Sequence, residues 1–309
     1  MFQKHKKHIF TVIMISTIWL FYENQSVEIT IRSSEGKELI YTMPRKDKNK
    51  LQSFFYNMFI LEMGSYPLFG IKPMAMGVYT RPLATSDWRD FISSIMPCNL
   101  KVYSGWKTWQ KYQHLFPITQ FALWEETNAF WIEPHSSVAI LLIHKKGFQE
   151  MLNANREDFV NVLGKNKLNA EEFLSEIKEK IFLKDTLLLH QGLIGTIFGF
   201  GRENSWLFEA RVQGAKVPLS YVWEGNKKVY DFMKNRPYKA WVYLGMSSDD
   251  FSSFLTYPCF SADLNSVETH QLQKKYIHAR EKILNFYQGK DLVETVLTLL
   301  INGPPHLLN

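Results

Sequence analysis

Residues 185–204 combine small, apolar and polar side chains in a pattern that simple packing does not require. The stretch reads DTLLLHQGLIGTIFGFGREN and places Gly192, Gly195, Gly199 and Gly201 within ten residues. Each glycine inside a helix costs about 1 kcal/mol relative to alanine. Gly195 and Gly199 are four residues apart, so on one helix they would share a face that another backbone or a ligand could approach closely.

Polar side chains flank these glycines and allow three interpretations. His190 precedes them, and Arg202, Glu203 and Asn204 follow at once. In the structural interpretation the glycines allow tight packing and a turn, and His190 is a hydrogen-bonded core histidine. In the binding interpretation Arg202 supplies a forked cation, with His190 and Asn204 orienting a ligand. In the catalytic interpretation His190 is a general base that Glu203 orients.

The known cofactor and metal motifs are absent. Gly199-Phe200-Gly201 lacks the third glycine of a dinucleotide fingerprint and follows a helical pattern instead of a strand. The chain has no P-loop, no HExxH, no GxSxG and no EF-hand loop. We therefore expect no cofactor and no metal, and we favour a binding or structural role over catalysis.

The two cysteines, Cys98 and Cys259, are the disulfide candidates. In an exported protein they could close one long loop, which would disfavour the unfolded chain by a few kcal/mol. Two distant thiols are equally compatible with a reduced protein. Their spacing excludes a CxxC redox pair and a cysteine-rich zinc site.

The N-terminal residues have the pattern of a targeting segment. Residues 1–8 are basic, and Ile9–Tyr22 is an apolar run of 14 residues. As a helix this run would be about 21 Å long, shorter than the hydrocarbon core of about 30 Å, which favours a signal peptide. The small-x-small cleavage pattern is missing, which favours an uncleaved signal-anchor. We predict export by residues 1–22, with the body periplasmic or anchored to the inner membrane through residues 9–22.

The charge balance excludes a nucleic-acid-binding protein. The net charge is +6, and the body after residue 22 carries 33 basic and 30 acidic residues, or +3. One basic run remains at Arg45–Lys50. It could contact phosphate or a membrane surface, but a solvated loop after Pro44 is the simpler interpretation.

Composition and periodicity predict an α+β fold. The chain of 309 residues is 46% hydrophobic and 15% aromatic, enough for a substantial core. Strands are predicted at 26–31, 38–42, 72–80, 121–125, 129–132, 137–144, 205–212, 217–222 and 240–244. Helices are predicted at 51–63, 86–94, 104–115, 147–163, 169 to about 198, 266–287 and 291–300.

Some of these predictions carry structural detail. The run 137–144 is apolar throughout, as in a central strand buried on both faces. Gly164 should end the helix before it, and Asn169 should cap the helix after it. We expect residues 23–309 to form a single α+β domain, a mixed or antiparallel sheet packed against several helices, with a possible two-lobe split near residue 164.

One stretch carries a resemblance. GTIFGFGRENSWLF (residues 195–208), with the basic-apolar N-terminus and an ET-rich C-terminal helix, resembles uncharacterised exported proteins of chlamydia-like intracellular bacteria. The resemblance implies a bacterial envelope setting and supplies no activity and no catalytic residue.

The sequence therefore predicts an exported or membrane-tethered cell-envelope protein with a binding or structural role. Its partner would be a protein or a small-molecule ligand, besides the membrane met by the N-terminal segment. The alternative is a hydrolase that uses His190 and Glu203.

Overall fold

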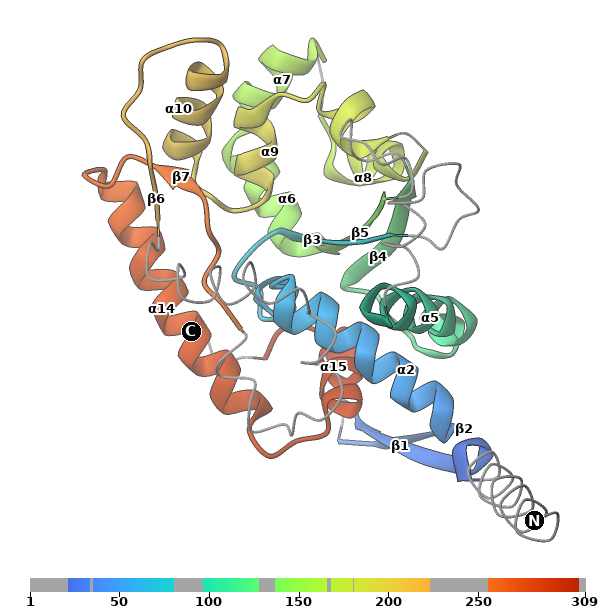
Figure 1. Cartoon of the computed structure of the whole chain (residues 1–309). Coiled ribbons are helices and arrows are strands. Elements are labelled where there is room, and N and C mark those ends of the chain that lie inside the picture. Colours follow the sequence, from blue (N-terminus) through green and yellow to red (C-terminus); the bar gives the residue numbers. More distant parts are fainter. Residues whose placement is uncertain are drawn as a thin grey trace, which may run out of the picture.

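The protein is built around a small antiparallel sheet with helices on both faces (Figure 1). The computed structural model describes residues 22–33, 36–80, 97–127, 137–165, 168–179, 181–222 and 255–305. Helices and antiparallel sheets pack together, which confirms the predicted α+β class. The predicted elements 86–94, 129–132 and 240–244 lie outside the described residues.

The central sheet has the strand order β3-β5-β4, with β3 at Met74–Thr80, β5 at Ser137–His144 and β4 at Phe121–Thr127. Both neighbours pair antiparallel with β5. Residues 138–143 are all buried, so the prediction of a central strand covered on both faces is confirmed. Successive side chains of a strand point to opposite faces of the sheet. Ile140 and Leu142 therefore belong to one hydrophobic cluster, and Leu141 and Ile143 belong to the other.

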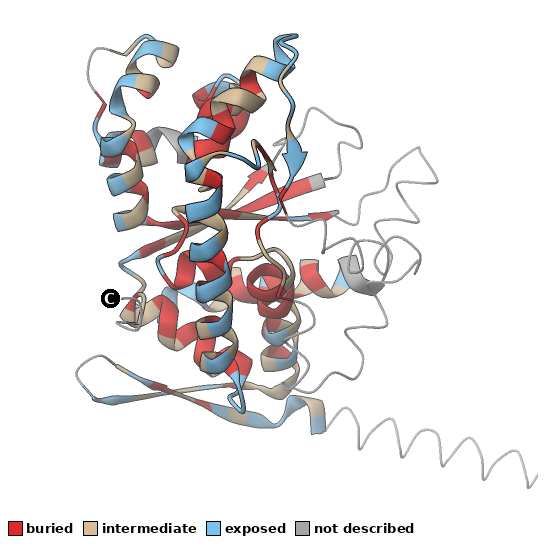
Figure 2. Ribbon diagram, turned by 90° about the vertical axis from the view of Figure 1, so that its left-hand side faces the viewer, coloured by how far each residue is buried: buried red, intermediate tan, exposed pale blue. Residues whose placement is uncertain are grey.

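The first cluster lies between the sheet, the early helices and the C-terminal helices. It is built from α2 (Arg45–Phe55), the π-helix η1 (Tyr56–Leu61), α3 (Ser65–Leu68), α5 (Pro97–Tyr112), α14 (Val267–Tyr287) and α15 (Leu292–Asn302). The short 3₁₀ helix η2 (Gln113–Leu115) follows α5. The strands predicted at 26–31 and 38–42 are β1 (Ser26–Arg32) and β2 (Glu38–Pro44), which pair as an antiparallel hairpin, and β1 packs against α15. Figure 2 shows buried residues on the inner faces of these helices.

The solvated-loop interpretation of Arg45–Lys50 is wrong. These residues form the first turns of α2, and Asp47 within them is buried. Pro44 stands immediately before the helix, where its fixed φ is compatible with a helix start. The predicted helix 51–63 therefore begins earlier, and its second half is the π-helix η1.

The second cluster covers the other face of the sheet. It contains α6 (Lys145–Ala154), α7 (Arg156–Leu163), α8 (Ala170–Glu179), the π-helix η3 (Phe182–Thr186) and α9 (Gln191–Ile197). Gly164 ends α7 in the left-handed region, as predicted. Phe159 and Phe173, on either side of Gly164, pack together in this cluster.

The predicted helix from Asn169 to about Phe198 is interrupted. Asn169 does cap its start, accepting the backbone N–H of Glu171 at 2.9 Å. However, Leu188 and Leu189 have φ of 53° and 56°, which no continuous α-helix can contain. The glycines consequently fall on a separate short helix, α9, and Gly199 lies beyond its end with φ of 76°. Gly195 and Gly199 therefore do not share a helix face.

The predicted strand 205–212 is wrong, because Arg202–Val212 forms helix α10. The predicted strand 217–222 is reduced to β6 (Ser220–Tyr221), which pairs with β7 (Ser261–Ala262). Both α9 and β7 pack against α10. Within the described part of the chain, no helix has the length and apolarity that a membrane span needs. Of the predicted segment 9–22, only Tyr22 belongs to that part.

Candidate functional site

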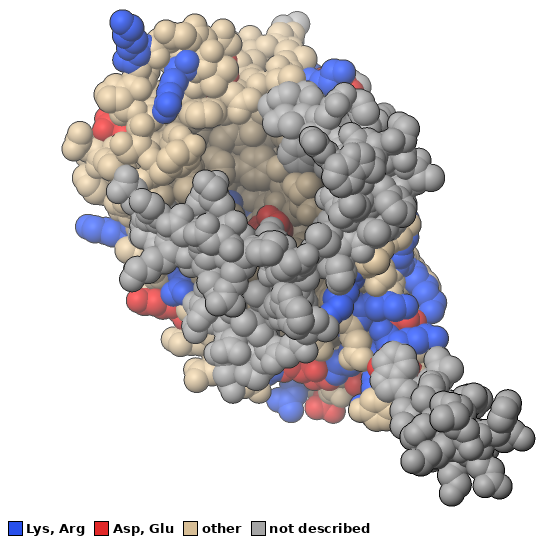
Figure 3. Space-filling model, viewed as in Figure 1, with Lys and Arg blue, Asp and Glu red and all other residues tan. Residues whose placement is uncertain are grey.

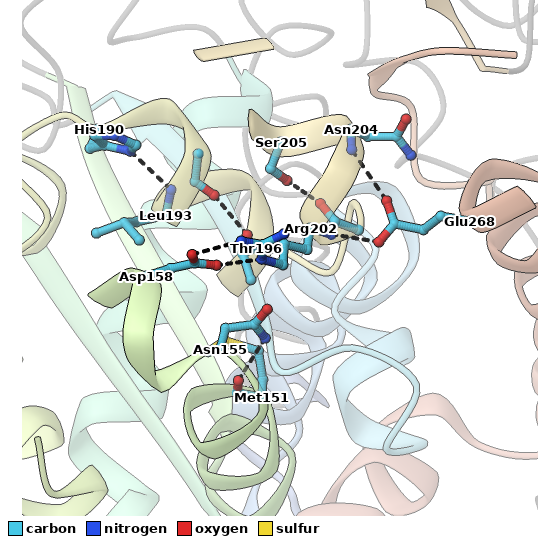
Figure 4. A network of polar contacts seen from close by, with 12 residues as sticks. Met151, Asn155, Asp158, His190, Leu193, Thr196, Arg202, Asn204, Ser205 and Glu268 are labelled. Atoms are coloured by element: carbon cyan, nitrogen blue, oxygen red, sulfur yellow. Dashed lines mark hydrogen bonds and ion pairs between the residues drawn. The ribbon is translucent and has the colours of Figure 1, made fainter. Parts of the chain in front are cut away.

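The predicted polar cluster lies where α7, α10 and α14 meet (Figure 4). Arg202 opens α10 and points its guanidinium at Asp158 of α7, with nitrogen–oxygen distances of 2.6 and 2.8 Å. Hydrogen bonding to Asp158 raises the pKa of Arg202 above its usual value. The forked cation that the binding interpretation assigned to a ligand therefore already holds a carboxylate of the same chain.

Asn204 is fully buried and joins three segments of the chain. Its Oδ1 accepts hydrogen bonds from the Asp263 backbone N–H at 3.2 Å and from the Thr269 hydroxyl at 3.0 Å. Its Nδ2 donates to the carbonyl oxygen of Phe200 at 3.3 Å. The side chain thus ties α10 to the start of α14 and to its own preceding loop.

Glu268 of α14 caps the N-terminus of α10. Its carboxylate accepts the backbone N–H of Arg202 at 2.8 Å and that of Asn204 at 3.2 Å. The first N–H groups of a helix have no partner within it and favour negative charge. Gly201, at the start of α10 with φ of 89°, leaves room for this carboxylate, because a Cβ there would overlap Glu268. Gly201 thus makes room for the carboxylate that caps α10.

His190 and Glu209 form the corresponding cap of α9. The backbone N–H of Gln191 donates to Glu209 at 2.6 Å, and Nδ1 of His190 accepts the N–H of Leu193 at 3.3 Å. Burial opposes the ionisation of Glu209. The hydrogen bonds from Gln213 and Gln191, with His190 nearby, nevertheless hold the Glu209 pKa below its usual value. The imidazole of His190 packs edge-on against Trp206, with ring centroids 4.9 Å apart.

The structure does not pair His190 with Glu203. The carboxylate near His190 is Glu209, at 3.7 Å, and Glu203 accepts a hydrogen bond from Ser266 at 3.0 Å. Six residues separate Glu203 from Glu209 along α10, which corresponds to about 9 Å at 1.5 Å per residue. The base and orienter of the hydrolase alternative therefore have other partners.

We expect His190→Ala to lower the free energy of unfolding by about 1 kcal/mol, because α9 loses its N-cap acceptor. His190→Asn should restore most of this loss, since asparagine is among the best N-cap residues. Urea titrations of the three proteins measure the difference. Equal stability of wild type and His190→Ala would show that this cap contributes nothing.

A cavity of about 220 Å³ opens beside the cluster, between α9, α10 and the β6–β7 ribbon. Its walls are mainly aromatic: Phe200 stacks on Phe260 with centroids 5.2 Å apart, and Phe208 and Tyr221 complete them. Gly195 forms part of the lining, where a Cβ would lie 2.9 Å from that of Ser205. The remaining lining residues are Gln191, Ile194, Asn204, Ser205 and Ser261. Among the described residues that line this cavity there is no Asp, Glu, Lys, Arg or His.

Of the predicted site residues, only Asn204 lines the cavity; His190, Arg202 and Glu203 do not. Sequence reasoning located the glycine segment but missed Phe208, Tyr221 and Phe260. Phe208 was assigned to a strand, and Phe260 lies 52 residues after Phe208, so no local pattern links the two. Only the pairing of β6 with β7 brings Tyr221 and Phe260 to the same wall.

Lys72 lies next to Phe200, one of the aromatic residues that line the cavity. Its side chain is buried, with Nζ 5.1 Å from the ring centroid of Phe200. Burial lowers the pKa of Lys72 to about 7. The ring of Phe200 therefore contacts Phe198 and Phe260 by stacking and also lies close to the amine of Lys72.

The described residues hold no group of three His, Cys, Asp or Glu side chains able to bind a metal. Cys259 is a free thiol, and its Sγ donates to the carbonyl oxygen of Val222 at 3.7 Å. The side chain of Cys98 lies outside the described residues, so a bridge between the two cysteines stays a prediction. No protein-family model, curated protein or solved structure matches the chain.

Proposed function

We propose that the protein is an exported, membrane-tethered binding protein whose cavity between α9, α10 and β6–β7 takes a small, uncharged, planar ligand. The observation that carries this proposal is the aromatic lining of the cavity, in which none of the described residues is charged. A closed apolar cavity of about 150 Å³ admits benzene, so about 220 Å³ suits a ring with a substituent or a fused second ring.

The hydrogen-bonding groups of the lining narrow the ligand further. Asn204 uses its amide within the fold, and Ser205 donates its hydroxyl to the carbonyl oxygen of Gly201. Gln191 donates its Nε2 to Leu189 at 3.0 Å, and its Oε1 has no partner in the hydrogen bonds of the described residues. Tyr221 and Ser261 add hydroxyl groups to the lining, so an N–H or O–H group of a ligand would find an acceptor there.

We expect 5-fluoroindole, an uncharged planar N–H donor, to bind with broadening of its ¹⁹F signal that excess indole reverses. Phe208→Ala should weaken this binding about tenfold, because the variant removes one aromatic wall worth on the order of 1–2 kcal/mol. Leu207→Ala is the matched control, since Leu207 is half-buried on the same helix and does not line the cavity.

Two outcomes would contradict the proposed site. The first is the absence of broadening with 5-fluoroindole at millimolar concentration. The second is equal weakening by Phe208→Ala and Leu207→Ala, which would place any binding elsewhere. The charged probe 4-fluorobenzoate should bind more weakly than 5-fluoroindole, because the cavity lining supplies no cation to compensate its carboxylate.

The membrane tether in this proposal is the apolar run of residues 9–22. Its support is the basic residues that precede it, the lack of a small-x-small cleavage pattern, and the resemblance of residues 195–208 to exported proteins. Flotation of the full chain with neutral phosphatidylcholine vesicles tests the tether. A chain that stays at the bottom of the gradient would argue against it.

A further inference from the structure

Helices α2 and α5 pack against each other and are strongly basic. Between them they contain seven lysines and arginines, four in α2 and three in α5, and one carboxylate, Asp47. Figure 3 shows Lys and Arg atoms gathered on the right-hand side of the molecule, over the ends of these two helices. The basic run that the sequence analysis singled out is therefore one part of a larger surface.

The carboxylate in these helices is directed inward. Asp47 is buried and accepts hydrogen bonds from the Tyr112 hydroxyl at 2.7 Å and from Lys111 at 3.1 Å, with Lys50 at 3.6 Å. Burial opposes its ionisation, but the hydrogen bonds from Tyr112 and Lys111 outweigh this and lower the Asp47 pKa. Asp47 thus holds two lysines in place while offering little negative charge to the surface.

One lysine of α2 is paired with carboxylates outside these two helices. Lys48 pairs with Asp291 at 2.9 Å and Glu294 at 3.4 Å, at the start of α15. Six lysines and arginines of the two helices remain, and all of them except Lys101 we call the basic face. They are Arg45, Lys46, Lys50, Lys107 and Lys111.

The basic face lies where the described chain begins. The guanidinium of Arg45 stacks over the ring of Tyr22, 4.2 Å from its centroid. Lys46 donates to Oδ1 of Asn24 at 2.6 Å. Tyr22 is the last residue of the apolar run 9–22 and is 47% exposed. A tether through that run would therefore emerge beside the basic face.

We propose that the basic face rests on a membrane surface that carries anionic lipid headgroups. This inference rests on the proposed tether, which would hold the face within the roughly 10 Å over which its charges act. Each lysine or arginine near an anionic bilayer adds to the attraction, and a single apolar anchor with a basic patch is a common pair of membrane signals. The exposed Tyr22 suits the headgroup region.

The experiment compares lysine acylation rates in the full chain on two kinds of vesicle at 0.1 M salt. One kind is pure phosphatidylcholine and the other contains one third phosphatidylglycerol. Mass spectrometry of the digested protein gives the rate at each lysine. We expect the anionic vesicles to slow acylation of Lys46, Lys50, Lys107 and Lys111 at least fivefold relative to neutral vesicles, and 1 M salt to abolish the difference. Lys216 and Lys274, which are exposed after α10 and on α14, are internal controls.

The possible outcomes test the basic face and the membrane tether separately. Flotation on neutral vesicles without selective protection on anionic ones would overturn the basic face and leave the tether intact. Salt-sensitive flotation on anionic vesicles only, with the four lysines protected, would support the face and overturn the tether. Protection of the same lysines by a single-stranded oligonucleotide, but not by vesicles, would reassign the surface to nucleic acid and overturn the proposal.

A charge-removal variant adds a second readout. Lys46→Gln, Lys50→Gln and Lys107→Gln together leave Lys111 to pair with Asp47, so the fold keeps that contact. This triple variant should lose the protection of Lys111. A triple variant of equal charge change at Lys216, Lys274 and Lys290 should retain it. Loss of protection in both variants would mean that net charge alone, and not the basic face, is responsible.

Discussion

Asn204→Ala should lower the free energy of unfolding by about 3 kcal/mol. The side chain is fully buried and satisfies the Asp263 N–H, the Thr269 hydroxyl and the Phe200 carbonyl. Removing it leaves buried donors without an acceptor, and each such group costs about 1–3 kcal/mol. Urea denaturation at neutral pH, followed by circular dichroism, gives the difference.

Glu203→Ala is the matched control for Asn204→Ala. Glu203 is the preceding residue on α10, is exposed and accepts one described hydrogen bond, from Ser266. Its replacement should change the stability by no more than about 0.5 kcal/mol. A loss in Asn204→Ala as small as that in Glu203→Ala would mean that the amide does not hold α10 to α14.

Glu126→Gln should stabilise the protein in alkaline solution and not in acid. Glu126 of β4 is buried, and neither carboxylate oxygen has a hydrogen bond of normal geometry among the described residues. Burial raises its pKa to about 7, partly offset by the nearby N–H groups of Phe182 and Leu183, with Asp185 adding to the rise. The folded protein therefore binds a proton at Glu126 that the unfolded chain releases near pH 4.5.

The sign of this pH dependence follows from the raised pKa. Below about pH 4.5 both states are protonated at Glu126, and the group costs nothing. Between about pH 4.5 and 7 the stability falls with rising pH, by on the order of 3 kcal/mol in total. Glutamine resembles the protonated acid, so the variant should gain about this amount at pH 8 and match the wild type at pH 4.

The neighbouring Glu125 supplies the control for Glu126. It accepts a hydrogen bond from the Tyr79 hydroxyl at 2.9 Å and another from the indole N–H of Trp106. Glu125→Gln weakens the acceptor for both donors, so it should destabilise the protein at pH 8. Urea titrations at pH 4, 6 and 8 compare the two variants. A Glu126→Gln stability that stays parallel to wild type across this range would show that Glu126 is ionised in the folded protein.

The sequence predicted the sheet and its nearest elements because their signals are local. The apolar run of β5, the left-handed Gly164 and the cap at Asn169 each depend on residues within a few positions. The same reasoning failed for α10. Its aromatic residues are only half-buried while Ser205 and Glu209 are buried, so its hydrophobic pattern does not reveal which face packs inward.

The candidate site depends on contacts that local patterns do not contain. Sequence reasoning marked the right segment, residues 185–204, from its glycines and polar residues. It could not show that Glu268 and Glu209, from distant positions, start the two short helices there. Since those carboxylates satisfy the helix ends, the glycines and polar residues are mostly architecture. The aromatic walls beside them form the cavity, and two of these walls come from the β6–β7 ribbon.

The cap of α10 also determines when this helix can be completed during synthesis of the chain. Glu268 lies 66 residues after Arg202, so a chain emerging from the ribosome exposes the start of α10 before its carboxylate exists. At about 5–20 residues per second, that interval is roughly 3 to 13 s. For most of this interval Phe200 has no Phe260 to stack against, and the nascent chain leaves this aromatic side chain without that partner.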